Sequence, residues 1–185
     1  ADTGSPARAV LVTQHSRFAL AHDARRRAGR SCGRSYDEHV GADVFISYAW
    51  TSPEHRQWVR LLAAHMKAVG YDVLIDADVS YGDSLSGFMG RAVDSRHVLL
   101  IVDPQYVDRA DAVPDSGVAI ENRWFKGIYD DKPASWLSIL FKDNPGSLLP
   151  AWLSSHNPKG HVFHADPFPG SEQVEELWRW IEDLP

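Results

Sequence analysis

The sequence is poor in cysteine, in long apolar runs and in excess positive charge. Its single cysteine, Cys32, cannot form an intrachain disulfide, so the reducing environment of the cytoplasm is the simplest expected location. The longest purely apolar run, Val98–Val102, has the length of a strand and falls far short of the roughly 20 residues that cross a bilayer. The 185 residues include 25 acidic and 19 basic ones, for a net charge of −6. We therefore expect no membrane partner and no direct binding to nucleic acid.

Common catalytic and metal-binding motifs are also missing. The chain has no Gly-x-Gly-x-x-Gly turn and no Gly-x-x-x-x-Gly-Lys-Ser/Thr loop, which argues against the usual dinucleotide-dependent dehydrogenases and NTPases. It has no Gly-x-Ser-x-Gly nucleophile elbow. Nine histidines are present, but none form a His-Glu-x-x-His pair, so we expect no metal site.

Charge divides the chain into two parts. Residues 1–42 hold seven arginines against four acidic residues, a net of +3, so residues 43–185 carry −9. Residues 1–42 also have only one short apolar patch. We expect a basic arm at 1–42, either a solvated, disordered tail or an expression-derived extension, and one folded domain at 43–185.

From Asp43 onward, segments typical of strands and helices alternate. The apolar, β-branched run at 43–48 is typical of a strand covered on both faces. Ser52-Pro53 predicts a helix start and Gly70 its end. Short β-α-β connections predict parallel strands with helices on both faces, that is, a flavodoxin-like three-layer α/β domain. The expected strands are 43–48, 71–75, 97–102, 136–141 and 161–164, and the later helices are 84–94, 117–128 and 171–184.

Ligands of such sheets bind at the carboxyl ends of the strands, near the point where the strand order reverses. The candidate positions are therefore residues 47–50, 76–83 and 103–106, which follow the first three strands. A phospho-accepting receiver domain needs an acidic residue after the first strand, where Ser47 and Tyr48 stand. This pattern argues against phosphotransfer.

Four ordered blocks of the sequence resemble the TIR/SEFIR superfamily, in its bacterial branch. They are residues 43–50 (DVFISYAW), 52–59 (SPEHRQWV), 70–76 with 81–89 (GYDVLID and YGDSLSGFM), and 116–121 (SGVAIE). The resemblance spans about residues 43–165. It implies a five-stranded parallel sheet flanked by helices, in agreement with the pattern described above.

The resemblance also implies an activity. Many TIR domains of bacteria and plants cleave NAD+ at the bond between nicotinamide and ribose with a single glutamate, and Glu121 matches that residue. Nicotinamide is a cationic leaving group, so the ribose develops oxocarbenium character that a fixed carboxylate stabilises. The reaction needs no cofactor or metal, because NAD+ is the substrate. The alternative for Glu121 is an acidic residue that is favoured near a helix start, whatever the function.

Further residues match the family less specifically. Trp124, one helical turn after Glu121, is either a substrate contact or a core residue of its helix. The loop after the second strand corresponds to one that packs against a neighbouring domain in relatives. The resemblance implies substrate binding by Phe45, Ser47, Tyr48, Trp50, Asp76, Tyr81 and Trp124, and assembly through Asp78, Gly82 and Asp83.

Two functions follow from the resemblance. The first is an NAD+ glycohydrolase or ADP-ribosyl cyclase acting as an effector of prokaryotic antiviral immunity. It would self-associate through TIR–TIR contacts, which form filaments if they are head-to-tail. A sensor outside this chain would control the assembly. Its acidic loop would face a basic surface that includes Arg91, Arg96 or Arg109. The second is an adaptor that binds other TIR or SEFIR domains without catalysis.

Overall fold

The structure, a computed structural model, describes residues 41–75, 85–163 and 172–184. The predicted basic arm lies outside the described residues, apart from its last two positions. No helix in the described ranges is long and apolar enough to cross a membrane.

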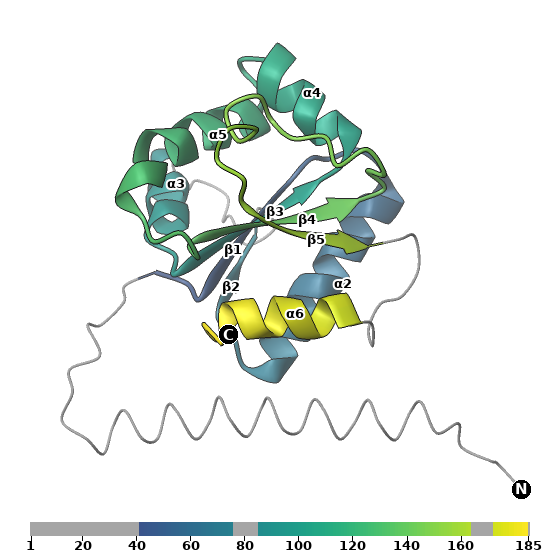
Figure 1. The fold of residues 1–185 in the computed structure, drawn as a ribbon, viewed down its shortest axis with the longest axis vertical. Helices are drawn as coiled ribbons and strands as arrows, with labels where there is room; N and C mark the ends of the chain where they lie inside the picture. The colour runs from purple at the N-terminus through teal and green to yellow at the C-terminus, as the bar shows by residue number, and fades with distance from the viewer. Residues whose placement is uncertain (1–40, 76–84, 164–171, 185) are drawn as a thin grey trace, which may run out of the picture.

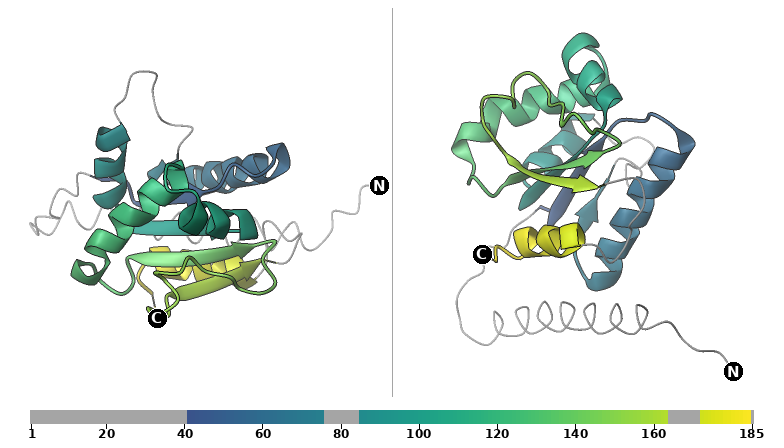
Figure 2. Two further views of the ribbon diagram at one scale, coloured as in Figure 1. Left: turned by 90° about the horizontal axis from the view of Figure 1, so that it is seen from above. Right: turned by 45° about the vertical axis from the view of Figure 1, so that its right-hand side comes forward.

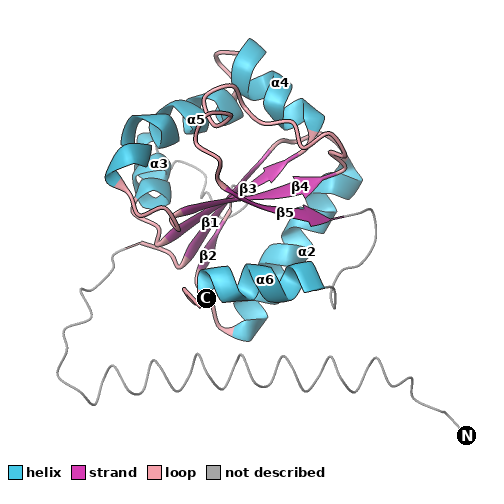
Figure 3. Ribbon diagram, viewed as in Figure 1, coloured by secondary structure: helices cyan, strands magenta, loops and turns pink. Residues whose placement is uncertain are grey.

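One parallel sheet forms the centre of the fold (Figures 1 and 3). Its strand order is β2-β1-β3-β4-β5, and every neighbouring pair is parallel. Four strands have five or six residues, whereas β2 contributes only two. The predicted α/β fold with a parallel sheet is thus confirmed. The strands are β1 (Val44–Tyr48), β2 (Val73–Leu74), β3 (His97–Val102), β4 (Leu137–Lys142) and β5 (Lys159–Phe163).

The strand order changes direction at the centre of this sheet. The chain passes from β1 outward to β2, and then returns to place β3 on the other side of β1. The carboxyl ends of β1 and β3 therefore flank the point at which open α/β sheets bind their ligands.

Helices cover both faces of the sheet (Figures 1 and 2). α2 and α6 lie on one side, and α3, α4 and α5 lie on the other. A short 3-10 turn, η2 (Tyr129–Asp131), follows α5. The helices are α2 (Pro53–Val69), α3 (Leu85–Val93), α4 (Pro104–Ala112), α5 (Gly117–Ile128) and α6 (Glu172–Ile181).

Successive residues of β1 point to opposite faces of the sheet and so join two separate cores. Val44, Ile46 and Tyr48 pack in the core that α2 and α6 cover. Phe45 and Ala49 pack in the core under α3, α4 and α5. Ser47 lies between Phe45 and Ala49 in the alternation, so its side chain points to the face of the sheet that α3, α4 and α5 cover. Ser47 is 1% exposed.

The ends of α2 agree with the capping signals in the sequence. The Ser52 hydroxyl accepts a hydrogen bond from the His55 backbone N–H at 3.1 Å, and Pro53 occupies the first helical position. Gly70 closes the helix with φ = 112°, a left-handed conformation that favours glycine. The predicted bounds of this helix are confirmed.

One helix, α4, was not predicted. The sequence predicts candidate ligand positions at residues 103–106, and in the structure Asp103 caps a helix there by accepting from the Tyr106 backbone N–H at 2.7 Å. Pro104 is the first helical residue. The Asp103-Pro104 pair is the same start signal as Ser52-Pro53, and it places Tyr106 inside the fold.

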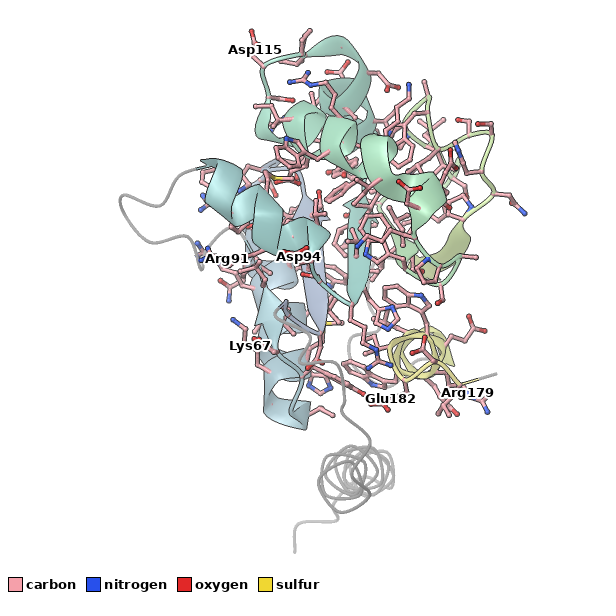
Figure 4. All side chains as sticks on the ribbon, turned by 90° about the vertical axis from the view of Figure 1, so that its left-hand side faces the viewer. Lys67, Arg91, Asp94, Asp115, Arg179 and Glu182 are labelled. Carbon is pink, nitrogen blue, oxygen red and sulfur yellow. The ribbon has the colours of Figure 1, made fainter. Side chains whose placement is uncertain are left out.

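The C-terminal segment is joined to the sheet through a buried contact. The Tyr71 hydroxyl, just before β2, donates to Glu182 Oε1 at 2.6 Å, and both residues are buried. Figure 4 shows Glu182 beside α6. Burial and the neighbouring Glu182 carboxylate raise the pKa of Tyr71, so its hydroxyl stays a neutral donor.

Candidate functional site

Glu121 lies on α5 and faces the carboxyl-terminal part of β1. The helix begins at Gly117, after Ser116, whose hydroxyl accepts from the Ala119 backbone N–H at 3.0 Å. The Glu121 side chain is half-buried, and its Oε2 accepts a hydrogen bond from Ser47 Oγ at 2.5 Å. A carboxylate is thereby held at the strand end where the sheet order changes direction.

Two further polar side chains extend this contact into the core. Ser47 Oγ lies 3.0 Å from the Tyr106 hydroxyl of α4. Asn122 of α5 donates through Nδ2 to that same hydroxyl at 2.9 Å and to the Val118 carbonyl at 2.8 Å. Tyr106 is 0% exposed and Asn122 3%, so the group is closed to solvent behind Glu121.

The buried phenol is the group whose titration the site changes most clearly. Burial raises the pKa of Tyr106, and the negative charge of Glu121 raises it further. The hydrogen bonds that Tyr106 makes with Ser47 and Asn122 act in the opposite direction and do not compensate. Tyr106 therefore remains a neutral hydroxyl that can donate one hydrogen bond.

Phe45, predicted to bind substrate, is buried beneath this group instead. Its ring packs edge-on against Phe88 and Phe125, with centroids 5.5 and 6.0 Å away, and the residue is 1% exposed. The structure therefore assigns Phe45 a packing role between β1, α3 and α5.

Tyr48 is placed on the other side of the sheet. It is buried in the core under α2, where its ring lies near that of His55 with centroids 6.1 Å apart. Because consecutive strand residues face opposite sides, Ser47 and Tyr48 cannot both face Glu121. The prediction that groups Tyr48 with the site is corrected on this ground.

Trp50 follows β1 at the surface. Its side chain is 53% exposed, and the Arg56 guanidinium lies 4.0 Å from the centre of its ring. Arg109 of α4 donates to the Trp50 carbonyl at 2.8 Å. Trp50 thus lies at the surface with a cationic side chain over its ring.

Trp124 is an exposed residue of α5, so its alternative interpretation as a core tryptophan is excluded. It is 44% exposed and lines a shallow hollow of about 350 Å³ together with Ile120, Arg123, Gly127 and Ile128.

The remaining predicted residues cannot be placed. Asp76, Asp78, Tyr81, Gly82 and Asp83 lie outside the described residues, and their roles stay predictions. Within the described ranges, no group of three or more His, Cys, Asp or Glu side chains is arranged to hold a metal ion.

Asn122 and Trp152 of this region were missed in the sequence, and Tyr106 was selected only as part of the range 103–106 after the third strand. Tyr106 could have been located through the Asp103-Pro104 helix start, which places it in the first turn of α4. Asn122 adjoins Glu121, but its buried position depends on how α5 packs. Trp152, whose indole N–H donates to Asn122 Oδ1 at 2.8 Å, lies between β4 and β5 and carries no sequence signal.

The fold and the site together define a parallel α/β domain with a carboxylate at the central change of strand order. The chain belongs to the TIR domain family, whose model matches residues 44–158. No curated protein matches the sequence.

Two solved structures share the fold. A prokaryotic SEFIR domain is 24% identical with a TM-score of 0.56, and the match covers 75% of this chain and 96% of that domain. The TIR domains of the activated Roq1 resistosome, which recognises the pathogen effector XopQ, are 15% identical with a TM-score of 0.53. That match covers 77% of this chain and 99% of the other. At these identities the likeness shows the fold alone.

Proposed function

We propose that this TIR domain is an NAD+ glycohydrolase or ADP-ribosyl cyclase in which Glu121 is the catalytic residue. TIR domains include NAD-cleaving enzymes. The observation that supports the proposal is the hydrogen bond between Ser47 Oγ and Glu121 Oε2, which holds a carboxylate beside the carboxyl end of β1. That location is where parallel α/β sheets bind nucleotides.

The chemistry needs little more than a fixed negative charge. Cleavage of the bond between nicotinamide and ribose releases neutral nicotinamide and leaves positive charge on the ribose. A carboxylate of fixed orientation stabilises this charge without reorganising during the reaction. Water or another nucleophile then attacks the ribose, and that choice decides between a linear and a cyclic product.

We place this activity in a cytoplasmic immune effector that is activated by self-association. TIR–TIR contacts would complete the site, with the segment containing Asp78, Gly82 and Asp83 against a neighbouring copy. A sensor domain or partner outside this chain would set the assembly, which becomes a filament if the contacts are head-to-tail.

A non-catalytic adaptor is the second candidate. The similarity to a prokaryotic SEFIR domain and the exposed Trp124 beside its shallow hollow are both compatible with a role in protein binding. An adaptor needs neither Glu121 nor turnover.

Nicotinamide release from NAD+ separates the two candidates. We would assay wild-type protein and Glu121→Gln at high concentration with a crowding agent, and follow the assembly state by size exclusion. Glu175→Gln, an equal charge change on the exposed surface of α6, is the matched control. Loss of release in Glu121→Gln alone supports catalysis. Equal rates in all three proteins remove the role of Glu121, and no release in any assembled state favours the adaptor.

A further inference from the structure

The side-chain amide of Asn122 has only one orientation that satisfies its neighbours. The Val118 carbonyl can only accept, and the Trp152 indole N–H can only donate. Nδ2 must therefore face Val118, and Oδ1 must face Trp152. The second hydrogen of Nδ2 then points to the Tyr106 hydroxyl, which accepts it at 2.9 Å.

This orientation determines the direction of the next two hydrogen bonds. The Nδ2 group of Asn122 can only donate, so the acceptor for the buried Tyr106 hydrogen is the other polar contact of its hydroxyl, Ser47 Oγ at 3.0 Å. Ser47 accepts that bond and so directs its single hydrogen to Glu121 Oε2 at 2.5 Å. The hydrogen bonds thus run one way, from Trp152 through Asn122, Tyr106 and Ser47 to Glu121, and we call this series the donor chain.

The donor chain requires that Glu121 Oε2 carries no proton. A carboxylate accepts the Ser47 hydrogen. A proton on Oε2 would instead require Ser47 to accept, and Ser47 would then donate back to Tyr106. Tyr106 would then accept from both Ser47 and Asn122, and its buried hydrogen would have neither of them as an acceptor. A proton on Oε1 would leave Oε2 able to accept, but a carboxylate is the stronger acceptor of the Ser47 hydrogen, so the donor chain favours the ionised form.

We propose that Tyr106 and Asn122 are positioning residues that hold the Glu121 carboxylate in one orientation and favour its ionised form, acting through Ser47. This inference rests on the proposed role of Glu121 and deepens it. The donor chain connects β1, α4, α5 and the segment between β4 and β5, so packing of the whole layer fixes the carboxylate. Hydrogen bonds made before the reaction cost no reorganisation in the transition state.

The test is Tyr106→Phe, which removes the hydroxyl and keeps the ring. Ser47 is then free to rotate its hydrogen away from Glu121. We expect kcat for NAD+ cleavage to fall roughly 10- to 100-fold with KM nearly unchanged. The acidic limb of the pH–rate profile should move to higher pH, because the carboxylate loses an oriented donor. Charged side chains elsewhere on α4 and α5, such as Arg109 and Arg123, are the same in both proteins.

Tyr71→Phe is the matched control. It also removes a buried tyrosine hydroxyl that donates to a carboxylate, that of Glu182, but in the core under α2 and α6. A loss of kcat caused by general destabilisation would appear in both variants. A loss through the donor chain appears in Tyr106→Phe alone, together with the shift of the pH profile.

A second measurement separates failure of this inference from failure of the proposed function. The titration of Glu121 is followed by ¹³C NMR of labelled glutamate carboxyls, with Glu121→Gln to assign the signal. Inactive Glu121→Gln with fully active Tyr106→Phe overturns the donor chain and leaves the proposed function intact. If wild-type protein does not cleave NAD+, the NMR midpoint decides: a higher midpoint in Tyr106→Phe supports the donor chain, and an equal midpoint overturns it.

Discussion

The direction of the hydrogen bonds behind Glu121 makes a quantitative prediction about stability. Ser47→Ala removes the donor to a carboxylate, and hydrogen bonds to charged groups contribute about 1.5–3 kcal/mol. It also leaves the Tyr106 O–H, which is 0% exposed, without an acceptor, and a buried unpaired donor costs about 1–3 kcal/mol. Because Glu121 is half-buried and water can replace the Ser47 donor, we expect the lower part of the summed range, so Ser47→Ala should lower the free energy of unfolding by about 2.5–4 kcal/mol.

Tyr106→Phe has a different cost. It leaves one Nδ2 hydrogen of the buried Asn122 unpaired, for about 1–3 kcal/mol. In the double variant, Ser47→Ala with Tyr106→Phe, the Tyr106 hydroxyl that Ser47→Ala alone leaves unpaired is no longer present. The loss in the double variant should therefore be smaller than the sum of the two single losses, by about 1–2 kcal/mol.

Urea unfolding of the wild type, the two single variants and the double variant measures this coupling, provided that the slope m is the same in all four proteins. The prediction needs no enzymatic activity. Ser47→Ala combined with Tyr71→Phe is the control, because Tyr71 packs on the opposite side of the sheet and the two losses should add. Additivity within about 0.5 kcal/mol for Ser47 and Tyr106 would refute the direct hydrogen bond between them.

Two further predictions concern packing and pH. A Cβ on Gly41 would lie 2.0 Å from the Asp94 carbonyl oxygen, so Gly41→Ala should destabilise by about 1–3 kcal/mol in urea unfolding. Gly90→Ala has open space inside α3 and should instead stabilise by about 0.5–1 kcal/mol, and equal effects would contradict the packing of Gly41. Burial lowers the pKa of His55 and of His97. As the pH falls, these histidines are therefore protonated in the unfolded chain, near the ordinary histidine pKa of about 6.5, before they are protonated in the folded protein. The free energy of unfolding should thus fall as the pH drops below about 6.5, and His97→Gln should reduce that slope; an unchanged slope would exclude His97 as a source.

Most elements of the fold could be predicted because their signals are local. Ser52-Pro53 and Gly70 specify the two ends of α2 through caps that involve neighbouring residues only. The bounds of β3 and α5 match their predicted ranges for similar reasons. The start of α4 carries the same local signal, Asp103-Pro104, within the range 103–106 that was predicted to hold ligand positions.

The candidate site was predicted less completely. Glu121 and Ser47 were both selected, on the resemblance to the TIR/SEFIR superfamily, and the structure brings them together. Phe45 and Tyr48 were grouped with them as neighbours in the chain. A strand sends consecutive side chains to different environments, so sequence proximity did not indicate a shared role.

By itself, the sequence determined the class of fold, the alternation of strands and helices, and the family to which the chain belongs. These depend on periodicity, caps and short motifs within a few residues of one another. Only the tertiary structure decided which side chains surround Glu121. Ser47 is separated from it by 74 residues, and Ser47 is separated from Tyr106 by 59. The strand crossovers bring these residues together, and the direction of their hydrogen bonds depends on a buried amide whose orientation the neighbouring elements set.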